Sequence, residues 1–205
     1  TCEVFQRLAG DLENHTKVSR LVDLNNGIIS AKAQSSEDAV VIDGALMTHS
    51  LSPMYRLLIL GAGDVAKFVA EMAIALEYDV MLCDPRPNYL DNWTVPGVET
   101  TAQLPDDVVR EHFSNPYSGI IALAHDPRVD DMALMEALKT NAFYIGAMGS
   151  VRTSAARRER LPELGLSSDE IDRLHAPIGF QINSKTPAEI AISVMAQITS
   201  VRYQQ

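Results

Sequence analysis

The chain has 205 residues, of which 46% are hydrophobic and 21% are charged, and its formal net charge is −10. This composition is typical of a globular protein with one sizeable domain and a smaller unit. The acidic balance excludes nucleic acid and anionic membrane as main partners, and no apolar run approaches the ~20 residues of a membrane-spanning helix. Because two cysteines are too few for a disulfide framework, we expect a cytoplasmic protein.

Residues 1–53 are predicted to form a small β-rich segment and a linker. Asn25-Asn26-Gly27 lies between two short apolar runs, and Asn and Gly tolerate the positive φ of a hairpin turn. The predicted strands are residues 19–23, 28–33 and 39–42. A linker is expected over residues 48–54. Because so small a unit cannot bury an apolar face alone, we expect it to need further protein surface.

Residues 54–205 open with a strand, a glycine turn, a helix and a second strand. The apolar run 57–60 suits a buried strand, and apolar residues at helical spacing follow the turn. The second run, 80–83, ends in Asp84. This order predicts an α/β fold with a doubly wound, mainly parallel, Rossmann-like sheet, preceded by the small antiparallel β segment.

The glycine turn, Gly61-Ala62-Gly63-Asp64, has the pattern of a phosphate-binding site. Gly61 permits a tight turn, and Gly63 lets the backbone approach a phosphate, which the helix start also favours. Asp84 stands twenty-one residues after Gly63, where a ribose-binding acid belongs. Arg86, between two prolines, is either a solvated loop residue or a partner for a phosphate.

A second group of candidate residues follows the apolar run 119–124. Asp126 precedes Pro127, which is explained by capping of a helix. His125 lies at the carboxyl end of a predicted central strand, where ligands bind in open α/β sheets. We therefore assign both to the site, with a structural histidine as the alternative.

A second glycine-rich turn, residues 146–152, predicts another anion site. Its candidate residues are Gly146, Gly149, Ser150 and Arg152. Alternatively, the glycines only shape a turn, Ser150 caps the next helix, and the arginines behind it form a solvated face. Repetition of the design at two strand ends favours a site, and we expect Arg86, Arg152 and His125 to line one pocket.

The other elements predicted in this part are helices at 105–113, 126–139 and 166–175, a strand at 142–145, and a last helix. The last helix begins with a capping box at Thr186 and Glu189. Its apolar stripe indicates core or a dimer interface. Trp93 is interpreted as a packing residue in a loop, and the sequence assigns no metal ligand.

Three stretches between residues 57 and 202 resemble the XdhC/CoxI family. They are GAGDVA with CDPRP, LAHDPRVDD with FYIGAMGSVR, and HAPIGFQINSKTPAEIAISVMAQI. The resemblance implies the Rossmann-like carboxyl-terminal domain of a cytoplasmic bacterial accessory protein for xanthine dehydrogenase-type molybdenum hydroxylases. Such a chaperone, rather than an enzyme, binds the molybdenum cofactor (a molybdopterin), holds it while a cysteine desulfurase supports its sulfuration, and delivers it to the apo molybdenum hydroxylase. Beyond the candidates above, the positions carried over are Pro177, Gly179 and Glu189.

The chain departs from the family's usual pattern at three positions. Asp64 stands in place of histidine, and a carboxylate there would repel a phosphate or coordinate a cation. Gln197 stands in place of glutamate and Asn183 in place of glycine. Residues 1–53 resemble the tail of the family's amino-terminal domain, so we expect a truncated domain there.

Two other functions stay open on the sequence. The glycine turn and Asp84 also suit an NAD(P)-dependent oxidoreductase, although no Tyr-x-x-x-Lys pair for hydride chemistry is present. A nucleotide-sensing Rossmann module, with dimerisation as its function, is the third hypothesis. A homodimer is expected in either the chaperone or the sensor.

Overall fold

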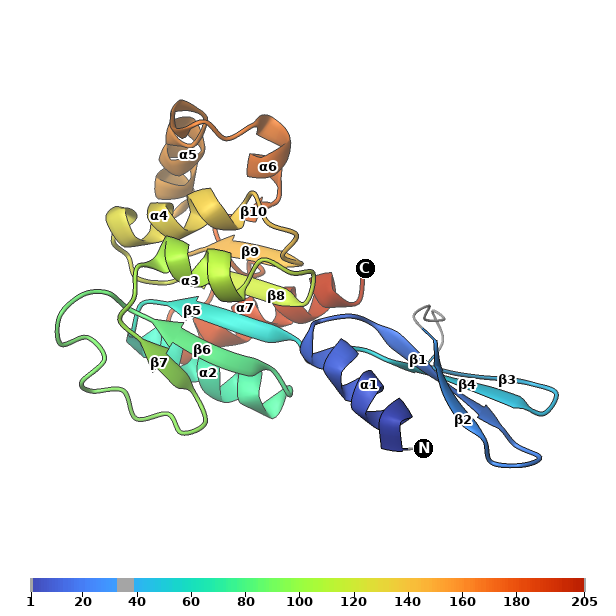
Figure 1. Cartoon of the computed structure of the whole chain (residues 1–205). Coiled ribbons are helices and arrows are strands. Elements are labelled where there is room, and N and C mark those ends of the chain that lie inside the picture. Colours follow the sequence, from blue (N-terminus) through green and yellow to red (C-terminus); the bar gives the residue numbers. More distant parts are fainter. Residues whose placement is uncertain (1, 33–38, 205) are drawn as a thin grey trace. The chain divides into compact units, whose positions relative to one another are not determined.

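The computed structural model describes residues 2–32 and 39–204. The chain divides into an amino-terminal unit, Thr1–Met54, and a carboxyl-terminal unit, Tyr55–Gln205. Each unit has its own β-sheet, one with four strands and one with six (Figure 1). Within the described residues, no helix is long and apolar enough to cross a membrane.

Among its described residues, the amino-terminal unit contains one helix and an antiparallel sheet in the order β2-β1-β4-β3. Its elements are α1 (Cys2–Glu13), β1 (Val18–Asp23), β2 (Ile29–Lys32), β3 (Val40–Asp43) and β4 (Leu46–Leu51). The predicted hairpin is confirmed, since β1 pairs antiparallel with β2. Gly27 in its turn has φ +72°, the conformation for which glycine is suited.

Two features of this unit differ from the sequence prediction. Residues 48–51, expected in a linker, belong to β4, which pairs with both β1 and β3. The polar run Thr48-His49-Ser50 hides this strand from a hydropathy pattern. No helix was predicted over α1, whose single buried residue is Leu8. Ala33, the end of the second predicted strand, lies outside the described residues.

The carboxyl-terminal unit contains a parallel sheet in the order β10-β9-β8-β5-β6-β7. Its strands are β5 (Arg56–Leu60), β6 (Asp79–Cys83), β7 (Glu99–Thr101), β8 (Ser118–Ala122), β9 (Tyr144–Ala147) and β10 (Leu174–His175). The predicted Rossmann-like fold is confirmed. The chain builds outward from β5 to β7 and then returns to the other side of β5 at β8, which makes a topological switch point between β5 and β8.

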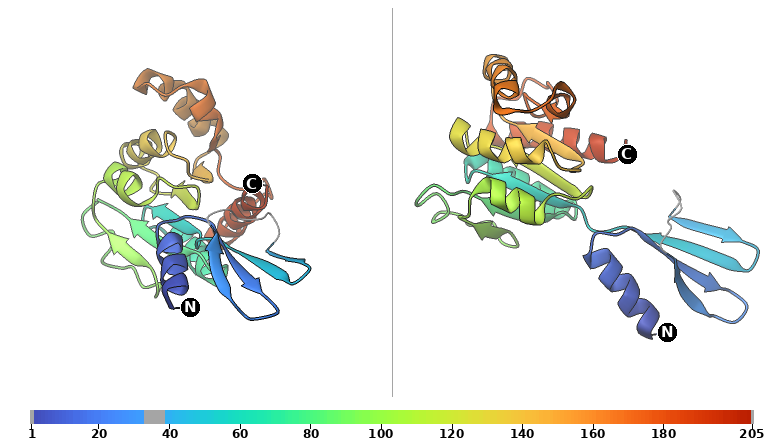
Figure 2. Two further views of the ribbon diagram at one scale, coloured as in Figure 1. Left: turned by 45° about the vertical axis from the view of Figure 1, so that its right-hand side comes forward. Right: turned by 45° about the horizontal axis from the view of Figure 1, so that its top comes forward.

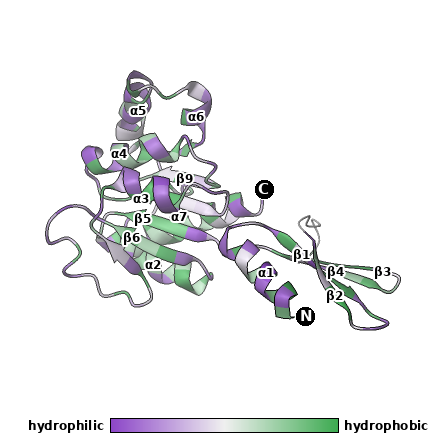
Figure 3. Cartoon of the chain, in the orientation of Figure 1, coloured by the Kyte–Doolittle hydropathy of each residue, from purple (hydrophilic) through white to green (hydrophobic). Residues whose placement is uncertain are grey.

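Helices cover both faces of this sheet (Figure 2). They are α2 (Asp64–Ala75), α3 (Pro105–His112), α4 (Pro127–Ala137), α5 (Val151–Arg160), α6 (Ser168–Asp172) and α7 (Pro187–Arg202), with a 3-10 turn at Pro162–Leu164. Leu58 and Leu60 share a core cluster with residues of α3 and α4, whereas Leu57 and Ile59 share one with residues of α2 and α7. Burial on both faces explains the continuous apolar runs of the central strands. Figure 3 shows β5 and β6 as mainly hydrophobic, whereas α5 is largely hydrophilic.

Some boundaries in this unit differ from the prediction, and two short strands were not predicted. β9 begins at Tyr144 rather than at residue 142, because Ala142 and Phe143 are buried before the strand starts. The predicted helix 166–175 is shorter, since α6 ends at Asp172 and the chain then enters β10. β7 and β10 were not predicted as strands, because three and two residues are too short to show a pattern.

The last helix begins as predicted, with a capping box between Thr186 and Glu189. Its apolar stripe lies in the core: Val194 and Ile198 are buried, and Ile190 and Val201 pack against the same cluster. Trp93 also packs against that cluster, as expected.

Candidate functional site

The predicted site residues lie along one edge of the parallel sheet. Since all six strands run parallel, the loops after their carboxyl ends meet at the same edge. The first glycine turn follows β5, Asp84 and Arg86 follow β6, and His125 and Asp126 follow β8. The second glycine turn begins within β9 and ends at the start of α5. Ligands of open α/β sheets bind at this edge.

The first glycine turn is packed tightly on one side and open on the other. Gly61 has φ +98°, and a Cβ added to it would lie 2.4 Å from the Cα of Ala124. Only glycine therefore fits where this turn touches the loop after β8. Gly63, at the start of α2, has nothing within 4 Å of an added Cβ. Asp64 is exposed in the first helical turn, where an acid stabilises the helix through its dipole.

Asp84 is fully buried and its carboxylate is occupied by protein donors. Oδ1 accepts hydrogen bonds from the backbone N–H of Arg86 at 3.1 Å and from its Nε at 2.9 Å. Oδ2 accepts from Nη2 of Arg86 at 2.7 Å and from the N–H of Ala62 at 2.9 Å. Four donors fill the lone pairs of a carboxylate. Asp84 thus ties the first glycine turn to Arg86.

These contacts keep Asp84 ionised. Burial by itself raises the pKa of Asp84, but the hydrogen bonds from Arg86 and Ala62 outweigh it, so the pKa lies below its ordinary value. The guanidinium of Arg86 also lies over the ring of Tyr89, 3.7 Å from its centroid, and its Nη1 donates to the carbonyl of Ala124 at 3.2 Å. Arg86 therefore joins the loops after β6 and β8, and is not a solvated residue.

His125 is exposed and has a left-handed backbone conformation, with φ +56°. The residue before it is held at both backbone groups, since the N–H of Ala124 donates to Asp130 at 3.2 Å and its carbonyl accepts from Arg86. After it, Asp126 caps α4 by accepting from the N–H of Arg128 at 3.0 Å, which confirms the predicted cap. A conformation of this kind costs about 1–3 kcal/mol and concentrates at functional sites.

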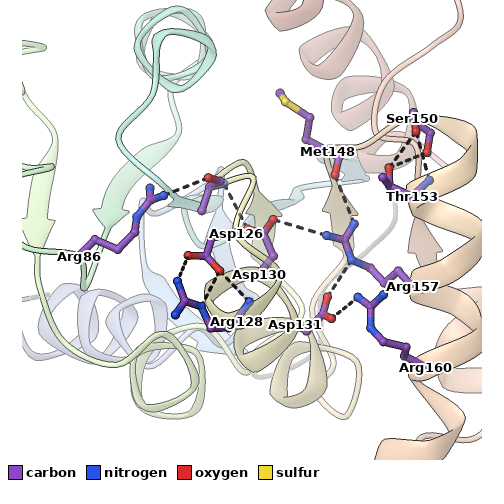
Figure 4. A network of polar contacts seen from close by, with 11 residues as sticks. Arg86, Asp126, Arg128, Asp130, Asp131, Met148, Ser150, Thr153, Arg157 and Arg160 are labelled. Atoms are coloured by element: carbon purple, nitrogen blue, oxygen red, sulfur yellow. Dashed lines mark hydrogen bonds and ion pairs between the residues drawn. The ribbon is translucent and has the colours of Figure 1, made fainter.

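A polar network continues from this loop to the second glycine turn (Figure 4). Arg157 is buried and donates to Asp131 at 2.9 Å, to Asp130 at 3.5 Å and to the carbonyl of Met148 at 3.3 Å. Arg160 donates to Asp131. Two of the arginines behind the second turn therefore bind carboxylates, and Arg158 donates to two carbonyl groups. The solvated-face interpretation is wrong for the buried Arg157, whereas Arg158 and Arg160 are paired but still partly exposed.

Asp130 is the acid of this network whose pKa is raised. Burial raises its pKa to about 6, although the guanidinium of Arg157 and the N–H of Ala124 act in the opposite direction. Its Oδ1 accepts from Ala124 in the loop after β8, and its Oδ2 accepts from Arg157 of α5, which also donates to Met148 after β9. The two candidate turns are thus linked by a continuous chain of contacts through Arg86, Ala124, Asp130 and Arg157.

In the second glycine turn, Ser150 caps α5 by accepting from the N–H of Thr153 at 3.1 Å. A Cβ on Gly146 would lie 2.7 Å from Cδ1 of Ile178, so this glycine makes room for packing. Arg152 is exposed, and within the described residues it makes no hydrogen bond or ion pair. Arg152 is therefore available to a ligand, unlike Arg86.

A groove of about 540 Å³ lies beside the second turn. It is lined by Met148, Gly149 and Val151, by the loop 177–184, and by Ile190 and Ser193 of α7. A smaller hollow of about 300 Å³ lies at the first turn, between Ala62 and the loop 87–92. Arg86, Arg152 and His125 are absent from the lining of both hollows, so these two do not provide the single pocket predicted for them.

Pro177 and Gly179 were carried over from the family resemblance, but the loop 177–184 that contains them was not assigned to the site from the sequence. Its position after β10 at the same sheet edge, with Pro177 and Gly179, is the signal that identifies it. Gly179 has φ +89°, and a Cβ there would lie 2.4 Å from Oγ of Ser193. Asn183 has φ +59°, which explains why asparagine replaces glycine here, since it tolerates this conformation best after glycine.

Gln197 fixes this loop to the sheet. Its Oε1 accepts from the N–H of Gly179 at 2.8 Å and from the hydroxyl of Tyr144 at 2.6 Å. A glutamate oxygen would accept the same two bonds, so the departure from the family's glutamate preserves the contact. Tyr144 in turn stacks on His175, with ring centroids 4.7 Å apart.

Among residues 2–32 and 39–204, no three His, Cys, Asp or Glu side chains are grouped to hold a metal ion. Cys83 is buried, donates to the carbonyl of Gln103 at 3.4 Å, and has a pKa raised by burial to about 12. Cys2 is exposed.

The protein family described as the XdhC Rossmann domain matches residues 57–198. The chain belongs to this family. The XdhC match includes both glycine turns, the Asp84–Arg86 pair and the whole groove loop.

Curated relatives of this XdhC chain are longer than it is. It is 31% identical over 153 residues to the molybdenum cofactor insertion chaperone PaoD of Escherichia coli K12, covering 75% of this chain and 42% of that protein. It is 27% identical over 158 residues to a probable xanthine dehydrogenase subunit of Bacillus subtilis 168, covering 77% and 46% respectively. The chain thus spans less than half the length of these two relatives.

A solved structure has the same fold. A crystal structure of a Bacillus halodurans protein described as a xanthine dehydrogenase aligns with a TM-score of 0.74 and 23% identity. The alignment covers 98% of this chain and 64% of that one.

Proposed function

We propose that this chain is an accessory protein of a xanthine dehydrogenase-type molybdenum hydroxylase and that it binds the molybdenum cofactor as cargo. Membership of the XdhC family supports the role, as does similarity to a chaperone named for inserting this cofactor. The observation that carries the proposal is Arg152, which is exposed and unpaired among the described residues beside the capped start of α5. An anionic group there meets a guanidinium and a helix N-terminus together.

The predicted residues then have two kinds of role. Gly149, Ser150, Arg152 and His125 contact the cofactor. Their positions depend on Asp84, Arg86 and the Asp126 cap, which hold the loops, and on Gly146, which makes room for packing. The first turn, Gly61 to Asp64, supports this edge through its contact with Ala124.

The proposed sequence of events includes two protein partners. The chain holds the cofactor while a cysteine desulfurase supplies sulfur, and then delivers it to the apo molybdenum hydroxylase in the cytoplasm. A homodimer would present two such sites.

NAD(P) binding is the competing function. It is supported by the glycine turn and by the open space at Gly63. A ribose hydroxyl would, however, need a free oxygen on Asp84, whose carboxylate already accepts four hydrogen bonds. Releasing Arg86 would leave a buried carboxylate without its ion pair, which is costly.

Binding is tested with cofactor released anaerobically from a purified molybdenum enzyme. The chain is mixed with it, passed through gel filtration and oxidised, and pterin fluorescence and molybdenum are measured in the protein fraction. We expect close to equimolar pterin, and transfer to an apo-hydroxylase that gains activity. Equimolar NAD(P)(H) in its place, or pterin no higher than with serum albumin, would contradict the proposal.

The role of Arg152 is tested with Arg152→Ala, with Arg110→Ala as the control. Arg110 is exposed in the same unit, on α3. We expect Arg152→Ala to weaken cofactor binding by at least about tenfold, the worth of one charge-assisted hydrogen bond, with an unchanged melting temperature. Equal binding by the two variants would remove Arg152 from the site.

A further inference from the structure

The groove beside the second turn contains no charged side chain. None of the thirteen described residues that line it is Asp, Glu, Lys, Arg or His, in a chain with 27 acidic residues. A ligand that enters the groove therefore faces no carboxylate at close range. An anionic molecule can be accommodated there without the repulsion that Asp64 would exert at the first turn.

Apolar side chains stand on both sides of the groove. Val151 on the α5 side is 76% exposed, and Phe180 and Ile182 on the loop side are 45% and 51% exposed. Buried or half-buried apolar groups, Ile178 and Ile190, lie deeper. Apolar walls with exposed apolar residues at the mouth are typical of small-molecule sites, and they suit the two faces of a flat ring.

The polar groups of the lining are uncharged amides and hydroxyls. Gln181, Asn183 and Ser184 follow one another closely in the loop, and each amide offers both donors and an acceptor. Such groups recognise a ligand edge with alternating N–H, C=O and ring nitrogen atoms. None of the lining groups is charged, so ionic recognition comes from neighbours of the lining, such as Arg152, which follows Val151.

The first part of the loop that carries these groups, residues 178–180, is held by hydrogen bonds. Gln197 binds the N–H of Gly179, the N–H of Phe180 donates to the carbonyl of Ser193 at 3.2 Å, and the N–H of Ile178 donates to the carbonyl of Ala147 at 3.0 Å. A preformed loop loses little entropy when a ligand binds.

From these observations we infer that the groove between α5 and the loop 177–184 binds the ring system of a flat, amide-edged heterocycle, with the ligand's anionic group directed to Arg152. The inference rests on the proposed function, for which it places the pterin ring of the cofactor in the groove and its phosphate at the start of α5. Val151, Phe180 and Ile182 then contact the ring faces, while Gln181 and Asn183 read its edge.

Groove-filling variants test the inference because two residues of the groove lining are exposed enough to be substituted without disturbing the core. Val151→Trp and Ile182→Trp place a larger side chain at the mouth, and Leu104→Trp is the matched control. Leu104 is 53% exposed in the same unit, before α3. All three variants are expected to keep the wild-type melting temperature. Two probes are used. Binding of the molybdenum cofactor is measured as oxidised pterin after gel filtration. Pterin itself, which has the ring but no phosphate, is followed by fluorescence anisotropy.

We expect the two groove variants to bind both probes at least about tenfold more weakly than the wild type, and Leu104→Trp to bind both as the wild type does. Arg152→Ala should weaken binding of the cofactor but leave the affinity for pterin within about twofold of the wild-type value. If the wild type binds both probes and the groove variants bind them equally well, the inference fails while the proposed function stands. If the wild type binds pterin in a groove-dependent manner but not the cofactor, the proposed function fails and the groove assignment stands. Binding of neither probe overturns both.

Discussion

The two glycine turns of the carboxyl-terminal unit have the same backbone design but differ in whether the polar groups beside them are already bound by protein. Both follow a parallel strand, both begin a helix, and both lie at the ligand-binding edge of the sheet. At the first turn the neighbouring acid and arginine bind each other and the turn itself. At the second turn the arginine is exposed and an uncharged groove opens beside it.

This difference shows that a glycine pattern typical of phosphate binding indicates the backbone geometry of the turn. It does not indicate whether hydrogen-bond donors are free to bind a ligand. Gly61 is required by the contact with Ala124 whether or not a ligand binds. What distinguishes the turns is whether their polar groups are already satisfied by protein. A satisfied site supports the fold, and an unsatisfied one can bind a ligand.

The largest loss of stability is expected for a substitution that disrupts the first turn. Gly61→Ala combines backbone strain, about 1–3 kcal/mol, with overpacking against the Ala124 backbone, again about 1–3 kcal/mol. We expect a loss of about 4 kcal/mol in the free energy of unfolding, the middle of the combined range, measured by urea titration. Gly63→Ala, where space is open, should cost less than about 1 kcal/mol. Similar costs for the two variants would show that the turn is not tightly packed.

Removing the Asp84 charge tests whether this pair supports the fold. Asp84→Asn leaves Arg86 and the N–H of Ala62 facing an amide, and breaking such a buried pair costs about 3 kcal/mol or more. The control is Asp79→Asn, since Asp79 pairs with Arg56 at 2.8 Å but at the surface, where the expected loss is below about 1 kcal/mol. Chemical denaturation at pH 7 measures both.

The lowered pKa of Asp84 also predicts a direction with pH. A carboxyl group whose pKa is lower in the folded state stabilises the protein above its unfolded pKa, and this stabilisation is lost as the pH falls through the folded value. Asp84→Asn should therefore lose less stability than the wild type on acidification below about pH 4. Parallel acid titrations would contradict the assignment.

Asp130 is expected to show the opposite pH dependence. Its pKa is raised to about 6, so its contribution to stability is full below the unfolded value near 4 and is lost as the pH rises through 6. Between pH 4 and pH 7 the free energy of unfolding of Asp130→Asn should therefore gain on that of the wild type by roughly 2 kcal/mol. A constant difference across this range would show that Asp130 titrates normally.

The smallest expected effect concerns the groove loop. Gln197→Leu leaves the N–H of Gly179 and the hydroxyl of Tyr144 unpaired, at a cost of about 2 kcal/mol, whereas Gln197→Glu retains the acceptor and should cost less than about 1 kcal/mol. If the loop is a preformed ligand site, Gln197→Leu also weakens pterin binding severalfold and Gln197→Glu does not. Unchanged binding by both variants would show that the clamp serves stability alone.

The parts of the fold that were predicted correctly are those with a strong local pattern. The runs 57–60, 80–83 and 119–124 correspond to β5, β6 and β8, because strands buried on both faces are continuously apolar. The caps at Ser150, Asp126 and Thr186 were also visible, since a cap depends on residues two or three apart. β4 and α1 were missed because they are half exposed and their apolar residues are few.

The site was predicted less completely than the fold. Its loops could be placed at one sheet edge from strand order, but the state of each polar group could not. The bond from Arg86 to Ala124 joins residues 38 positions apart, and the clamp from Gln197 to Tyr144 joins residues 53 apart. Contacts of this range depend on the assembled sheet, so no local pattern indicates them.

The burial of Cys83 gives the protein an internal reporter. This thiol is at the end of β6, next to Asp84, and its raised pKa keeps it unreactive while the sheet is closed. Cys2 is exposed and reacts without any opening. Labelling the unmodified chain with a thiol reagent therefore gives two phases. The fast phase, from Cys2, calibrates the chemistry. The rate of the slow phase, from Cys83, follows opening of the sheet edge at the first turn, so the lifetime of that closed edge can be measured without introducing a probe.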